Sequence, residues 1–79
     1  MRRALGRRVR QLRTGLGLTQ EQLAERAELH WTHISGIERG QYNVKLSTLT
    51  QVARGLGITL SDLFAGVAPS PRARASSKH

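Results

Sequence analysis

The segment TQEQLAERAELHWTHISGIERG, residues 19–40, constrains the fold of this chain more than any other part of the sequence. Thr19 and Gln22 have the spacing of a capping box, which predicts that a helix begins here. Apolar residues recur at helical spacing first in one half of the segment and then in the other: Leu23, Ala24 and Ala27, then Ile34 and Ile37. The segment therefore predicts two short helices joined by a tight turn.

The turn and the second helix carry their own signals. Glu28 lies at the turn, where a left-handed backbone would cost about 1 kcal/mol relative to glycine. His30 is a candidate cap for the second helix, which ends at Arg39 and Gly40. Helices this short need support from neighbouring elements. The outer face of the second helix contains no acid and consists of Trp31, Thr32, His33, Ser35 and Gly36.

Helical patterns also precede and follow this segment. We expect a first helix over about residues 3–14, with an apolar stripe and many arginines. A fourth helix is expected to be capped by Ser47 and closed by Gly57, with an apolar face of Leu49, Val52, Ala53 and Leu56. A short fifth helix is predicted to start at Thr59, with Asp62 three residues on. The expected fold is all-α, a five-helix bundle in residues 1–67. Residues 68–79, with two prolines and three bases, are expected to form a disordered basic tail.

Composition narrows the class of protein. Seventy-nine residues permit one small domain and leave no room for a ligand-sensing module, so we expect no small-molecule ligand and no cofactor. The chain has no cysteine, and no apolar run approaches the roughly 18 residues of a membrane span. We therefore expect a cytoplasmic protein without a membrane partner.

The net charge of +8 is unevenly distributed. Six bases lie within residues 1–13 and three within 67–79, whereas residues 14–66 hold four bases and five acids. Attraction to a polyanion would then come mainly from the two ends, and sequence reading from the middle. The N-terminal arginines either contact phosphates or only keep the protein soluble.

Residues 19–40 resemble the helix-turn-helix of the phage repressor and Cro family. Gln20 opens the first helix, Ala24 lies where the two helices touch, and the segment ends in IERG at residues 37–40. RQLRTGLGLTQ and NVKLSTLTQVARGLGITLSDLF resemble the family's first, fourth and fifth helices, so the match covers about residues 5–66. THISGIERGQYNV further resembles the small controller proteins of restriction-modification systems.

This resemblance implies that the first residues of the third helix enter the major groove of DNA. Carried over by position, the base-reading residues are Trp31, Thr32, His33 and Ser35, unless Trp31 packs into the core. The resemblance also implies an ion pair between Arg13 and Glu38, unless Arg13 is exposed. Phosphates need donors without base selectivity. The candidates, each otherwise an ordinary solvated side chain, are Gln20 at a helix N-terminus and Arg39, Gln41, Asn43 and Lys45 after the reading helix.

The fifth helix is more apolar than the end of a small domain needs, with Leu60, Leu63, Phe64 and Val67. One such domain makes few DNA contacts, so we expect a homodimer joined through this helix on two half-sites about 34 Å apart. The predicted function is a sequence-specific transcriptional regulator that binds double-stranded DNA. A protein-interaction module of the same fold, such as an antitoxin half or a coactivator bridge, is the alternative.

Other functions have less support. RNA binding is weakened by the presence of only three aromatic residues. No catalytic constellation is evident, so an enzyme is not expected. His30 and His33 have the i, i+3 spacing of metal ligands, but no cysteine or well-placed acid offers a third ligand.

Overall fold

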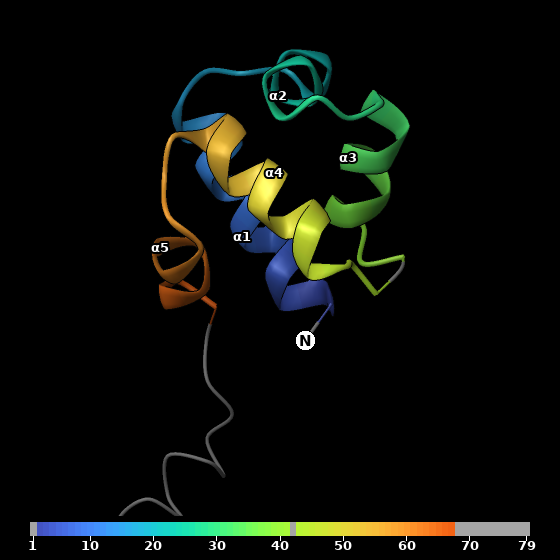
Figure 1. Cartoon of the computed structure of the whole chain (residues 1–79). Coiled ribbons are helices and arrows are strands. Elements are labelled where there is room, and N and C mark those ends of the chain that lie inside the picture. Colours follow the sequence, from blue (N-terminus) through green and yellow to red (C-terminus); the bar gives the residue numbers. More distant parts are fainter. Residues whose placement is uncertain (1, 42, 68–79) are drawn as a thin grey trace, which may run out of the picture.

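A computed structural model describes residues 2–41 and 43–67, and this part of the chain is helical (Figure 1). The helices are α1 (Arg2–Gly15), α2 (Gln20–Ala27), α3 (Trp31–Glu38), α4 (Leu46–Leu56) and α5 (Leu60–Ala65). The predicted all-α, five-helix fold is therefore confirmed. The predicted tail, 68–79, lies outside the described residues.

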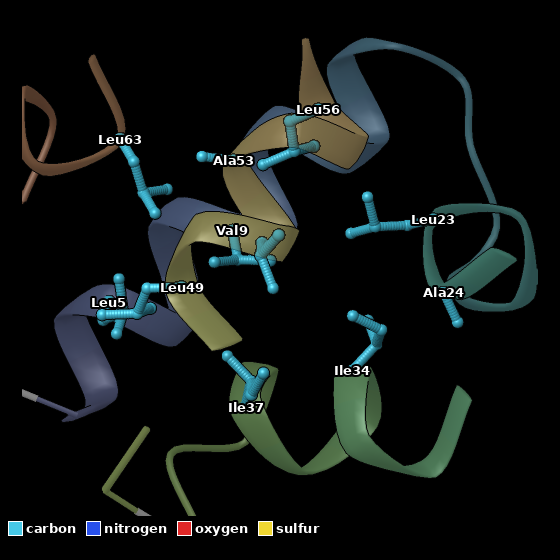
Figure 2. Packing of buried hydrophobic residues seen from close by; sticks show 11 residues of the cluster. Leu5, Val9, Leu23, Ala24, Ile34, Ile37, Leu49, Ala53, Leu56 and Leu63 are labelled. Atoms are coloured by element: carbon cyan, nitrogen blue, oxygen red, sulfur yellow. The ribbon is translucent and has the colours of Figure 1, made fainter. Parts of the chain in front are cut away.

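The helices pack around one apolar core. α2 packs on α3 and α4, and α1 packs on α3 and α5. In Figure 1, α3 and α5 lie on opposite sides of α1 and α4. The core draws residues from all five helices (Figure 2): Leu5, Val9, Leu23, Ala24, Ile34, Ile37, Leu49, Val52, Ala53, Leu56 and Leu63. The apolar faces predicted from helical spacing in α2, α3 and α4 are the buried ones.

Three of the four predicted N-cap residues are confirmed. Thr19 and Gln22 form both hydrogen bonds of the capping box at α2. His30 caps α3, because its side chain accepts the backbone N–H of Thr32, and Thr59 caps α5 in the same way. Each cap satisfies a backbone donor that the helix itself leaves without an acceptor.

The predicted cap of α4 is wrong. Lys45 occupies the N-cap position and makes no side-chain cap hydrogen bond, so the helix begins one residue before Ser47. The first intrahelical bond joins the N–H of Leu49 to the carbonyl of Lys45 at 3.0 Å. Ser47 therefore lies inside the first turn of α4 and not at its N-cap.

The turn between α2 and α3 contains a left-handed residue, the conformation whose cost the sequence analysis considered for Glu28. Glu28 has a φ of 60°, and among the described residues it is the only non-glycine with a positive φ. Its N–H donates to the carbonyls of Ala24 and Glu25, which ends α2.

The described helices are also too short or too polar to cross a membrane.

Candidate nucleic-acid interface

The two faces of α3 differ sharply in burial. Ile34 and Ile37 are fully covered by the core (Figure 2). On the outer face, Thr32 is exposed, Ser35 is half-buried, and Trp31 keeps 45% of its surface exposed. The alternative in which Trp31 folds into the core is therefore wrong. Three of the four residues expected to read bases thus lie on one outward side of α3.

Two other residues of α3 lie off this face. Gly36, which the sequence analysis placed on the outer face, is buried, and its carbonyl accepts the N–H of Gln41 at 3.0 Å. This correction follows from helix geometry, because position 36 faces the loop that returns from α3. His33 is half-buried on the side of α3 that faces the start of α4.

His30 organises the start of α3 in a way that sequence reasoning recognised only as a cap. Its Nδ1 accepts the N–H of Thr32 at 3.2 Å and lies 2.8 Å from the hydroxyl oxygen of Thr32. Its ring stacks on that of Trp31, with centroids 6.1 Å apart. An Nδ1 that accepts a backbone N–H carries no proton, so the hydroxyl of Thr32 donates to it. One imidazole therefore orients two expected base readers.

An open hollow of about 490 Å³ lies beside these residues, between α3 and the start of α4. Thr32 and His33 line one side of it, and Asn43 and Lys45 line the other. Two expected base readers and two expected phosphate contacts are thus brought to one concave surface. This grouping fits a site that contacts base edges and the neighbouring backbone together.

The remaining phosphate candidates lie around this surface. Arg39 and Gln41, directly after α3, are exposed. The Nε of Arg39 donates to the carbonyl of Ser35 at 3.4 Å, which holds the guanidinium along the outer side of α3. The described exposed side chains that follow α3 are therefore either basic or neutral as far as Lys45.

Behind the outer face, a cluster of charged groups fixes the end of α3. The guanidinium of Arg13 donates to both carboxylate oxygens of Glu38, at 2.6 and 3.0 Å, and also to the carbonyl of Leu18 at 2.8 Å. Only 11% of the Arg13 side chain and 3% of the Glu38 side chain are exposed. The hydrogen bond to Glu38 raises the pKa of Arg13 above its ordinary value. The ion pair implied by the resemblance is therefore present, and it joins α1 to α3.

Gln20 belongs to the same cluster. Its Nε2 donates to Glu38 Oε1 at 3.1 Å, an interaction that sequence reasoning did not foresee. A primary amide has two N–H groups, so a phosphate can still accept the second one. Glu38 thereby positions a candidate phosphate donor at the start of α2.

The surface expected to join two copies needs one correction. Leu63 is fully buried against the core, so it offers nothing to a second chain. Leu60, Phe64 and Val67 are half-buried around the core and remain on the surface of α5 and its end. Arg8 ties this element to α1, because its guanidinium donates to the carbonyls of Asp62 and Leu63 at 2.9 and 3.2 Å.

Within residues 2–41 and 43–67, no three histidine or acidic side chains lie close enough together to hold a metal ion.

Comparison with known proteins decides the family. The model of the helix-turn-helix family matches residues 9–63, which include α2, the turn and α3. The chain belongs to the helix-turn-helix family. Control protein C.BamHI of Bacillus amyloliquefaciens is 41% identical over 65 residues, covering 81% of this chain and 80% of that protein.

Other helix-turn-helix proteins extend the comparison. The immunity repressor of Bacillus phage phi105 is 47% identical over 57 residues, covering 72% of this chain but only 40% of the repressor. The crystal structure of the restriction-modification controller protein C.AhdI from Aeromonas hydrophila has a TM-score of 0.76 and 42% identity, over 78% of this chain and 94% of that one. The clp gene regulator ClgR from Corynebacterium glutamicum has a TM-score of 0.80 and 31% identity, over 98% and 82% respectively.

Proposed function

We propose that this helix-turn-helix protein is a sequence-specific transcription regulator that binds duplex DNA as a homodimer, with the first turn of α3 in the major groove. The acid-free outer face of α3 carries this proposal. The single acid of α3, Glu38, has a side chain that is 3% exposed and paired with Arg13, so α3 itself presents no free carboxylate to the phosphates. The related control proteins, repressors and transcriptional regulators support the same function class.

In this proposal, the residues that contact base edges are Trp31, Thr32, His33 and Ser35. A hydroxyl or an imidazole can exchange hydrogen bonds with base edges, and Trp31 can pack on a thymine methyl or the sugar-phosphate wall. Since His30 orients both Trp31 and Thr32, the reading surface is largely set before DNA arrives. Preorganisation of this kind lowers the entropy cost of binding.

The residues proposed to contact the DNA phosphate backbone are Gln20, Arg39, Gln41, Asn43 and Lys45. These residues flank α3 from the start of α2 and from the loop before α4. Contacts of this type hold the helix in register without carrying sequence information. They also make affinity fall steeply with salt, because each neutralised phosphate releases counterions.

The homodimer is proposed to form through Leu60, Phe64 and Val67. They are the half-buried apolar side chains at α5, on the opposite side of α1 and α4 from α3 (Figure 1). Replacing Phe64 with glutamate should shift the protein to monomers in sedimentation and lower operator affinity cooperatively. A monomeric parent protein that still binds a palindrome tightly at micromolar concentration would contradict this interface.

Selection of bound duplexes from a random library, followed by anisotropy, tests the function. Thr32→Ala should relax preference at one base pair of each half-site by about 1–3 kcal/mol, whereas Lys45→Ala should weaken all duplexes equally and reduce the salt slope of the dimer by about 1.8, or about 0.9 for each protomer. Arg54→Ala, an exposed residue of α4 outside the proposed surface, is the control and should change neither. Failure of the parent protein to bind any duplex at low salt would favour the interaction module.

A further inference from the structure

The outer face of α1 carries a row of arginines that the fold does not use. Arg3, Arg7 and Arg10 have i, i+4, i+7 spacing, so they lie along one side of the helix, and all three are exposed. Two other arginines of α1 have structural partners, since Arg8 binds the end of α5 and Arg13 binds Glu38. We call Arg3, Arg7 and Arg10 the α1 arginine row.

Repulsion between the charges of the α1 arginine row destabilises α1 in the isolated chain. Like charges at i, i+4 destabilise a helix, and α1 contains no acid that would offset them. Among the described residues, the only salt bridge is that of Arg13 with Glu38, so no carboxylate neutralises the row. An external polyanion would remove the repulsion.

One end of the row lies beside the proposed DNA surface. A Cβ atom added to Gly40 would lie 3.1 Å from Cγ of Arg3, so Arg3 packs beside the turn that joins Arg39 to Gln41. From there the row extends for about 10 Å along α1, at 1.5 Å per residue, to Arg10. It therefore begins next to the proposed phosphate contacts Arg39 and Gln41 and extends away from them along α1.

The surroundings of the row favour a phosphate backbone over a protein. An open hollow of about 580 Å³ lies between α1 and the end of α5, and its lining residues are Ala4, Arg7, Arg8, Arg10, Gln11, Thr14 and Gly66. It contains no large apolar side chain, and the exposed large apolar residues of the described chain, Leu16, Trp31 and Leu46, do not line it. Protein interfaces have an apolar centre and a polar rim, whereas phosphate contacts are made by arginine, glutamine and threonine.

We propose that the α1 arginine row is a second phosphate-binding surface, which engages duplex DNA flanking the half-site read by α3. This inference rests on the proposed function. Each protomer then contacts a longer stretch of DNA than its base-reading residues require. The additional contacts are independent of sequence, because guanidinium groups on phosphates do not distinguish bases.

Two duplexes that carry the selected site test this inference. One ends at the outer edges of the half-sites, and the other extends them by about ten base pairs of random sequence on each side. The parent protein should bind the extended duplex more tightly, and the salt slope should be steeper by about 0.9 for each added phosphate contact, or about 5 for three contacts in each protomer of a dimer. This advantage should then fall about 1,000-fold between 50 and 200 mM salt.

Charge-matched variants assign the effect to the row. R7Q/R10Q should lose most of the advantage on the extended duplex while binding the short duplex like the parent protein. R26Q/R54Q removes the same charge from exposed positions on α2 and α4 and should keep the advantage. Circular dichroism should show both variants folded, since neither changes a buried residue.

Several outcomes would overturn the inference. It fails if the parent protein binds both duplexes equally, or if R26Q/R54Q loses the advantage as fully as R7Q/R10Q. It also fails if length has no effect but poly-glutamate binds the row, since the partner is then an acidic protein. Absence of binding to the short duplex would refute the proposed function itself, which separates the two failures.

Discussion

Glu38 offers the sharpest test of how the chain holds its reading helix. Replacing Glu38 with alanine removes the acceptor of three hydrogen bonds, two from Arg13 and one from Gln20. The guanidinium of Arg13 would keep only the carbonyl of Leu18 as a partner. Since 11% of the Arg13 side chain is exposed, water reaches it poorly, and the charge is left uncompensated.

The expected cost follows from that burial. Breaking a buried ion pair by removing one partner costs about 3–5 kcal/mol, and we expect about 3 kcal/mol because Arg13 retains one hydrogen bond. A chain of 79 residues has a free energy of unfolding of about 4–12 kcal/mol. At about 4–8 °C per kcal/mol, the melting temperature should fall by about 12–24 °C.

Thermal and urea unfolding followed by circular dichroism measure this loss. Glu25→Ala, which removes an exposed acid of α2, is the control and should change stability by less than about 0.5 kcal/mol. The double variant R13M/E38M should recover most of the stability, because apolar replacement of a buried pair is often neutral. If the Glu38→Ala variant were as stable as the Glu25→Ala control, the ion pair of Arg13 with Glu38 would not hold α1 to α3.

Three further predictions follow from single positions. Gly6→Ala should destabilise the fold by about 1–3 kcal/mol in urea unfolding, because the added Cβ would lie 2.7 Å from the carbonyl oxygen of Glu38. Glu28→Gly should raise stability by up to about 1 kcal/mol in the same assay, since it relieves a left-handed non-glycine residue. Trp31 is the only tryptophan, so its fluorescence should change when DNA binds, and Trp31→Ala should weaken binding while leaving the melting temperature nearly unchanged.

The features that sequence predicted well are local. The Thr19 capping box and the His30 cap each depend on residues within four positions of one another. Helical spacing likewise identified the buried faces of α2, α3 and α4, because a short helix is stable only with its apolar side covered. The resemblance supplied the one distant contact that was foreseen, between Arg13 and Glu38.

The features that sequence missed are made by residues far apart in the chain. Arg8 binds carbonyls more than 50 residues away, and no local pattern separates it from its exposed neighbours on α1. The inward bond of Gln20 and the full burial of Leu63 also depend on where other helices lie. At α4, the helix begins at Leu46, after Lys45, although Ser47 is the better capping residue.

The division of α3 into a buried side and an outward side has an evolutionary consequence. Ile34 and Ile37 anchor the helix, whereas Trp31, Thr32 and Ser35 take no part in the core. Mutations among the outward residues can therefore accumulate with little penalty in folding. A lineage built on this scaffold can drift from one target sequence to another while its architecture stays the same.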